Sequence, residues 1–233
     1  MKFSHAFKEM DNHLKTHIHT ITCHEIFEIK NDFYKIVEAL CGSTANLTGI
    51  TELLIFRFMY HALNMQGPIE DKSVQQGNIR LYIGNRYLVK NGKFQEPDIV
   101  IEKNDEIRFL LSIKNRLNTI SPTNNEKVSP LVQELTLQNG LYTTSIQDIF
   151  RVENIRHGVH SNFNSITIVF SKVPQRHGKS NNLIEQKFDW HRFLILEGNY
   201  NSFVTELSSK LNFNIKRGWD KTQLLNEKSQ RNF

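Results

Sequence analysis

The sequence predicts an α/β fold with a mixed central β-sheet flanked by helices. Three observations favour this class. A helical region extends to about residue 67, two hydrophobic β-like segments then follow one another across a polar turn, and a buried strand comes after another helix. We expect residues 1–70 to form a helical region that packs on an α/β core of residues 71–220, with a polar tail at 221–233, unless the whole chain is one single domain.

Composition limits the class of protein. The chain has 233 residues, of which 39% are hydrophobic, and this is enough for a substantial core. The net charge of +5 suits a polyanionic partner, although many basic proteins bind nothing acidic. Cys23 and Cys41 form neither a disulfide framework nor a zinc spacing, so we expect reduced thiols in the cytoplasm. The chain has no signal-peptide pattern and no apolar run of membrane-spanning length, so we expect no membrane partner.

Helices are expected where caps and terminators frame a helical pattern. The expected helices are 31–42, 51–67, 129–138 and 201–212. Thr51 is a plausible cap for the second helix. Ser129 as the cap and Pro130 at the first helical position are typical of a helix start, and they fix the beginning of the third helix.

Strands are expected where β-branched and aromatic residues cluster. The expected strands are, in chain order, 78–90, 93–102, 107–115, 165–173 and 193–198. Asn91 and Gly92 between the first two strands are a strong signal for a tight hairpin turn. We expect the polar stretch 70–78 to be a flexible connection and 177–182 to be a basic loop between strands, while 146–164 carries no decisive pattern.

Two charged residues stand in apolar strands. Asp98 begins one apolar run and Lys114 ends the next. A buried charge is costly unless it is paired or binds a metal. Side chains alternate between the faces of a strand, so Lys114 shares a face with Ser112. If Lys103 pairs with Ile107, Asp98 sits opposite Ser112 and Lys114 is one diagonal step away, whereas a slip of one residue would separate them.

The residues Pro97, Asp98 and Lys114 resemble the motif of the PD-(D/E)xK nuclease superfamily, also called restriction-endonuclease-like. Ser112 departs from that motif, because it stands where the family usually has Asp or Glu. The resemblance covers roughly residues 51–171. It implies a restriction-endonuclease-like core within the α/β fold, and Mg²⁺-dependent hydrolysis of DNA phosphodiester bonds in which Mn²⁺ can substitute.

The resemblance also implies roles for single residues. Asp98 would ligate Mg²⁺, and Lys114 would hold the attacking water or help to deprotonate it. Some members of the superfamily carry Ser-x-Lys and supply the missing acid from the following helix, where Glu134 is the favoured residue of this chain. Glu126 and Glu96 are further candidates for that acid.

Glu52 is expected to join Asp98 and Glu134 as a metal ligand, because the family often has a glutamate on the helix before the sheet. Each assignment has a structural alternative. Glu52 suits the dipole at a helix start, and Glu134 suits the solvated side of a helix. Asp98 and Lys114 could form a surface ion pair, but their apolar neighbours argue against it.

Basic residues suggest where DNA would be contacted. The predicted nucleic-acid contacts are Arg116, Arg156, Arg176, His177 and Lys179. A solvated loop explains the last three equally well. His13 and His17 are spaced as a zinc pair on a helix would be, although solvated or packed histidines are the favoured interpretation. Trp219 could stack on a base, but it is more often a core anchor.

We therefore expect a Mg²⁺-dependent endonuclease of double-stranded DNA, in the simplest case a type II restriction enzyme that acts as a homodimer. Ser112 favours an alternative, a catalytically inactive relative that uses the fold to bind DNA or another protein. A phage or transposon recombination nuclease is a third interpretation, which the sequence does not separate from restriction.

Overall fold

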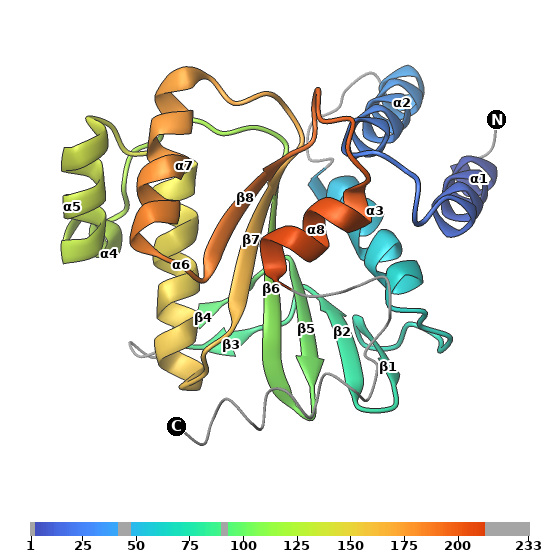
Figure 1. Ribbon diagram of the computed structural model, residues 1–233, viewed down its shortest axis with the longest axis horizontal. Coiled ribbons are helices and arrows are strands. Elements are labelled where there is room, and N and C mark those ends of the chain that lie inside the picture. The colour runs from blue at the N-terminus through green and yellow to red at the C-terminus, as the bar shows by residue number, and fades with distance from the viewer. Residues whose placement is uncertain (1–2, 42–47, 90–92, 213–233) are drawn as a thin grey trace.

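A six-stranded sheet forms the centre of the protein in this computed structural model, which describes residues 3–41, 48–89 and 93–212 (Figure 1). Its strands in spatial order are β1 (Ser73–Gln76), β2 (Ile79–Ile83), β5 (Ile99–Lys103), β6 (Glu106–Lys114), β7 (Asn164–Val169) and β8 (His191–Ile195). A separate two-stranded ribbon pairs β3 (Tyr87–Leu88) with β4 (Phe94–Gln95). The mixed sheet and its covering helices confirm the expected α/β class.

Helices cover both faces of the sheet (Figure 1). On one face lie α2 (Cys23–Cys41), α3 (Thr48–Ala62) and α8 (Phe203–Leu211), with α1 (Phe3–Thr16) packed against α3. On the other face lie α6 (Thr144–Val159) and α7 (Gln175–Lys187), with α5 (Pro130–Asn139) packed against their outer side and the short α4 (Asn124–Lys127) beside α5 (Figure 1). None of the helices in the described ranges combines the length and hydropathy that a membrane crossing requires.

The strand directions explain where the helices lie. The pairs β1–β2, β2–β5 and β5–β6 are antiparallel, and short turns connect most of these strands. The pairs β6–β7 and β7–β8 are parallel. Parallel neighbours need crossover connections, which usually contain a helix. Here α4, α5 and α6 connect β6 to β7, and α7 connects β7 to β8. The expected basic loop at 177–182 is therefore wrong, because those residues belong to the crossover helix α7.

The β5–β6 hairpin sets the register of the charged residues. Asn104 and Asp105 form its turn with φ of 54° and 60°, as a two-residue hairpin turn of this kind requires. Lys103 pairs with Glu106, so the expected pairing with Ile107 is wrong. A bulge between Ile101 and Glu102 then shifts the register by one residue.

Beyond the bulge, Ile99 pairs with Leu111. The same register extended by one residue sets Asp98 opposite Ser112, as the sequence predicts. Ile99 faces the core beneath α1, α2, α3 and α8, whereas Val100 and Leu110 face α6. By alternation, Asp98 and Ser112 share the face of Val100 and Leu110.

Several helix boundaries differ from expectation. α2 begins at Cys23 rather than near residue 31, because Thr22 and Glu25 form a capping box in which each side chain accepts a hydrogen bond from the other's backbone amide. α3 begins at Thr48, so Thr51 lies inside the helix and does not cap it. α5 begins as expected, with Ser129 accepting a hydrogen bond from the Val132 amide. α8 lies within the expected range 201–212.

The strand predictions also need correction. The stretch 70–78 contains β1, so it is not simply a flexible connection. Gly84, with φ of 64°, separates β2 from β3, which were expected to form one strand. The Asn91–Gly92 turn lies outside the described residues, although Leu88 and Phe94 on either side of it pair as antiparallel strands. Three further positions also lie outside the described residues. They are Gly42 at the end of the expected helix 31–42, Trp219, and the polar tail 221–233.

α6 lies very close to the β3–β4 ribbon at a glycine. A Cβ atom on Gly158 would lie 2.6 Å from the backbone oxygen of Leu88, which is closer than real Cβ contacts come. Val89, whose Cα atom would lie 3.0 Å away, belongs to the apolar cluster that α6 forms with the sheet. The ribbon therefore rests on α6 at a point where only glycine fits.

We predict that His191 makes the protein less stable in acid. Its ring nitrogens lie 2.6 Å from Ser165 Oγ and 3.3 Å from Thr167 Oγ1, and burial lowers its pKa to about 4. As the pH falls from about 6.5 to about 4, the unfolded chain takes up a proton that the folded protein excludes, which removes roughly 3 kcal/mol of stability. Urea unfolding of wild type and His191→Gln should therefore give free energies that converge on acidification. A difference in unfolding free energy between wild type and His191→Gln that stays constant between about pH 7.5 and about pH 4.5 would contradict the prediction.

Candidate active site

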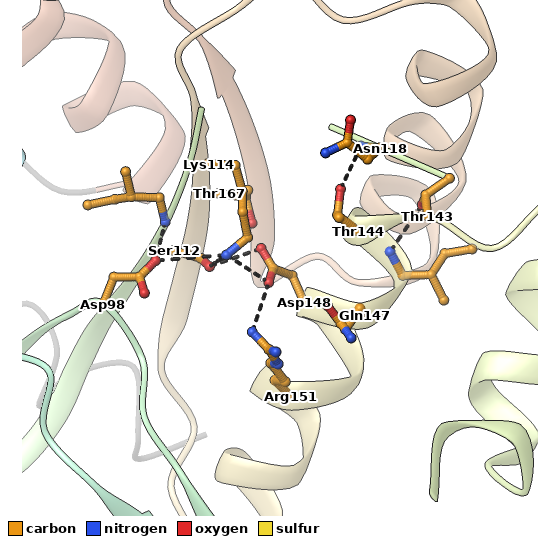
Figure 2. A network of polar contacts seen from close by, with 12 residues as sticks. Asp98, Ser112, Lys114, Asn118, Thr143, Thr144, Gln147, Asp148, Arg151 and Thr167 are labelled. Carbon is orange, nitrogen blue, oxygen red and sulfur yellow. Dashed lines mark hydrogen bonds and ion pairs between the residues drawn. The ribbon is translucent and has the colours of Figure 1, made fainter. Parts of the chain in front are cut away.

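Four polar side chains meet on the α6 side of the sheet (Figure 2). Asp98 stands just before β5, Ser112 and Lys114 lie on β6, and Asp148 lies on α6. The structure thus brings together three residues that the sequence singled out and a fourth that it did not. The backbone of Asp98 is fixed from the neighbouring strand, because its carbonyl accepts a hydrogen bond of 3.0 Å from the Gly84 amide.

The Lys114 ammonium group lies between two carboxylates. Its Nζ atom is 3.1 Å from Asp148 Oδ1 and 3.9 Å from Asp98 Oδ2. It also donates a hydrogen bond of 3.1 Å to Ser112 Oγ. The Ser112 hydroxyl in turn donates to Asp148 Oδ2 at 2.9 Å, and the Ile113 amide donates to Asp98 Oδ2. Ser112 therefore connects the lysine to the acid on the helix.

Asp148 is the functional candidate that sequence reasoning missed. α6 starts after Thr143, whose side chain accepts a hydrogen bond from the Ile146 amide. Asp148 then falls on the stripe of α6 that faces the sheet, beside Ile149 and Val152, and only 2% of its side chain is exposed. The available signal was an aspartate inside an apolar stripe of helical spacing, in a segment that was left without an assigned structure.

The electrostatics fix Lys114 as a cation. Burial alone would lower the pKa of Lys114, but the negative charges of Asp148 and Asp98 outweigh burial and hold that pKa above its usual value. Burial raises the pKa of Asp98, although Lys114 and the Ile113 amide act in the opposite direction. Lys114 in this arrangement is thus suited to stabilising negative charge or holding a water molecule, and not to accepting a proton.

Glu52 lies close enough to this group for its charges to change the pKa of the Glu52 carboxyl. It is half-buried on α3, and burial together with the charge of Asp98 raises the pKa of its carboxyl. Lys114 acts in the opposite direction on the same carboxyl. The structure therefore places Glu52 within electrostatic reach of Asp98.

The other candidate acids lie elsewhere. Glu134 is exposed on α5, where its carboxylate forms an ion pair of 2.5 Å with Lys187 of α7. Glu126 lies on α4 and accepts a hydrogen bond from the Thr123 amide as part of the capping box that starts this helix. It also accepts a hydrogen bond from the Gln147 side chain. Glu96 pairs with Arg86 and Lys72. The helix carboxylate next to Ser112 is therefore that of Asp148, and Glu134 is paired with α7 instead.

A small pocket opens beside the four side chains. Its volume is about 20 Å³, which is enough for one or two water molecules. Its lining residues include Asp98, Ser112, Asp148 and Arg151. No three His, Cys, Asp or Glu side chains in the described part of the chain gather closely enough to hold a metal by themselves.

The residues nevertheless fit a magnesium ion that takes its other ligands from water and substrate. Mg²⁺ in proteins is typically bound by one or two carboxylates, several waters and substrate phosphate oxygens. Asp98 and Asp148 are two carboxylates that already share one cation, the Lys114 ammonium group. A donor set of this kind suits a hard divalent cation better than zinc, which prefers nitrogen and sulfur ligands.

The predicted DNA contacts fall into two groups. Arg116, Arg176 and Lys179 are exposed. Arg156 instead lies with its guanidinium group 4.2 Å from the Trp190 ring centre and donates a hydrogen bond to the Phe163 carbonyl, so it packs the fold together. His177 is buried on α7.

His13 and His17 lie at the surface of the protein. The rings of His13 and His17 lie 4.4 Å apart near the end of α1. His17 Nδ1 lies 3.1 Å from the His13 carbonyl oxygen, so this ring nitrogen is directed at the backbone. Cys23 is buried as a free thiol, and burial raises its pKa to about 12.

We predict that Lys114→Ala destabilises the protein at neutral pH by about 3 kcal/mol or more, because it leaves the buried Asp148 and the partly buried Asp98 next to each other without the charge of Lys114 between them. The loss relative to wild type should shrink on acidification, since Asp98, whose pKa burial raises, then takes up a proton. Denaturant unfolding across pH measures both effects, with the exposed Lys179→Ala as a matched control. Equal stability of Lys114→Ala and the control would show that the ion group contributes nothing to folding.

The chain matches no protein-family model, no curated protein and no solved structure at the level expected of a relative. A functional argument therefore depends on the side chains of the site and their geometry. Asp98, Ser112, Lys114 and Asp148 are the residues that carry it.

Proposed function

We propose that the protein is a metal-dependent endonuclease with a restriction-endonuclease-like core, in which Asp148 replaces the acid that is missing at Ser112. The observation that carries the proposal is the direct hydrogen bond of 2.9 Å between Ser112 and Asp148. It puts a carboxylate from a different element next to the position where the resembling family carries its second acid. The resemblance of Pro97, Asp98 and Lys114 to the family motif supports the same conclusion.

Each side chain has a role that its surroundings support. Asp98 and Asp148 would hold Mg²⁺, which supplies polarisation of the phosphate and a water of lowered pKa. Lys114 would stabilise the negative charge that develops on the phosphate, because it stays protonated. Ser112 orients Asp148 and Lys114 through its two hydrogen bonds. Glu52 would adjust the charge of the site from α3.

The substrate that suits this site is double-stranded DNA. The net charge of +5 favours a polyanion, and Arg116, Arg176 and Lys179 are exposed for phosphate contacts. We propose a restriction-type enzyme in the cytoplasm, acting as a homodimer so that both strands are cut. A phage or transposon recombination nuclease would use the same chemistry.

One observation favours a second candidate function. The charge of Lys114 is already compensated by two aspartates, so the group can also stabilise the fold with no metal bound. The protein would then be an inactive scaffold that binds DNA or another protein. Metal titration separates the two functions, because only the enzyme needs a divalent cation between Asp98 and Asp148.

We predict cleavage of plasmid DNA with Mg²⁺ or Mn²⁺, and binding of Ca²⁺ without turnover. The physical reason is that the paired carboxylates can hold any of these hard cations, while the reaction depends on the smaller ions. Plasmids from several unrelated sources should be incubated with each metal and examined for nicked and linear forms. If no metal supports nicking of any plasmid, the scaffold function is the better conclusion.

We predict that Asp148→Asn abolishes cleavage as fully as Asp98→Asn does, a loss of at least about a hundredfold. Glu134→Gln is the matched control on the neighbouring helix α5 and should cut at the wild-type rate. The exchange variant Ser112→Asp with Asp148→Ser should recover part of the activity, because it returns the acid to β6 while keeping the hydrogen-bonded pair. Loss of cleavage in Glu134→Gln together with activity in Asp148→Asn would reverse the assignment.

A further inference from the structure

α6 carries a second charged residue close to Asp148. Arg151 follows it by one helical turn, and Arg151 Nη1 lies 4.0 Å from Asp148 Oδ1 (Figure 2). The two side chains differ greatly in exposure, with 2% for Asp148 and 46% for Arg151. Asp148 therefore reaches inward to Lys114, while Arg151 stands at the solvent side of the same group.

The guanidinium group of Arg151 is largely free to bind a ligand. Arg151 lines the same small pocket as Asp98 and Ser112. Within the described part of the chain its one polar contact is the long ion pair with Asp148, and it donates no hydrogen bond there. Arginine carries several N–H donors in a flat fork. These donors are left for something outside the protein.

Two other arginines show how an arginine with a structural role looks in this fold. Arg57 forms a two-pronged pair with Asp11, with N–O distances of 2.5 Å and 2.7 Å. Arg156, on the same helix as Arg151, lies on the Trp190 ring and donates to the Phe163 carbonyl. Arg151 makes neither a two-pronged pair nor a ring contact in the described structure, so packing does not account for its position.

The charge of the site explains why an arginine is needed there. With both aspartates ionised, Asp98, Asp148 and Lys114 together carry one net negative charge, which repels a phosphate. Without a metal ion, the charge of Lys114 is already compensated by the two carboxylates. Arg151 brings the group to neutrality at its exposed side. Its fork also matches two oxygens of a phosphate, which a lysine does not do.

We propose that Arg151 binds a phosphate of the substrate strand at the mouth of the Asp98–Asp148 pocket. The inference rests on the proposed nuclease function, because it assigns this residue to the phosphodiester that is cut. A contact of this kind positions the strand and carries no information about base sequence. The substrate class is thus a phosphodiester backbone, held by a fork of N–H donors one helical turn from the catalytic carboxylate.

The first experiment measures binding without divalent metal. A short mixed-sequence DNA duplex is titrated with wild type, Arg151→Ala and Arg151→Lys over a series of salt concentrations. Removing one phosphate contact should reduce the slope of log affinity against log salt by about one unit. Arg151→Lys should keep most of the slope because it keeps the charge. Lys15→Ala, on α1 at the opposite face of the sheet, is the control and should match wild type.

The second experiment measures cleavage of the same duplex with Mg²⁺. Arg151→Ala should cut about a hundredfold more slowly at saturating DNA, and Arg151→Lys should recover only part of that loss because it lacks the fork. Denaturant unfolding of each variant shows whether the fold is intact. A purely structural Arg151 would lower stability while leaving the salt slope unchanged, so the slope separates the two roles.

The outcomes distinguish this inference from the proposed function. Suppose that wild type cuts DNA and that Arg151→Ala keeps both the wild-type salt dependence of DNA affinity and the wild-type cleavage rate. The proposed phosphate contact is then overturned, while the proposed nuclease function is kept. If wild type cuts nothing with any metal but the slope falls in Arg151→Ala, the nuclease function fails and the phosphate contact is supported. If wild type binds no duplex at any salt concentration, the contact is overturned as well.

Discussion

One shared cation organises the candidate site. The Lys114 ammonium group pairs with the carboxylates of Asp98 and Asp148. Asp98 stands just before β5, and Asp148 lies on α6, which packs on the sheet. Burying these three charges costs desolvation energy, and only close mutual pairing offsets it. The position of α6 against β6 is therefore tied to the charges as well as to apolar packing. Asp98 and Asp148 would hold a metal ion there only by giving up part of their pairing with Lys114.

The hairpin irregularity is what lets this group form. The tight turn at Asn104 and Asp105 gives a register in which Lys103 pairs with Glu106. Continued without interruption, that register would set Asp98 one residue out of line with Ser112. The bulge after Ile101 restores the alignment over the part of the hairpin that carries the site. Bulges of this kind often lie near active sites, because one extra residue redirects the side chains beyond it.

Much of this arrangement could be predicted from local sequence patterns. Alternation along two strands predicted that Asp98 lies opposite Ser112, but from a pairing of Lys103 with Ile107 that is wrong, and the alignment holds because of the bulge. The mixed α/β class followed from the order of elements. Asp148 was not predictable in the same way, because its contact with Ser112 joins elements far apart in the chain. Its own helix was obscured by polar residues in the buried stripe, such as Ser145. α7 was missed because strands β7 and β8 were not recognised as parallel neighbours, which require a crossover.

The glycine contact between α6 and the β3–β4 ribbon has a consequence for evolution and design. Because a Cβ atom at Gly158 would meet the Leu88 carbonyl at 2.6 Å, any larger residue must push the helix and the ribbon apart. The same helix carries Asp148 and Arg151 several turns earlier, so a displacement at its far end tilts both side chains relative to β6. Gly158 thus permits the close approach of α6 to the ribbon, and the position of the helix that carries the acid depends in part on a residue without a side chain.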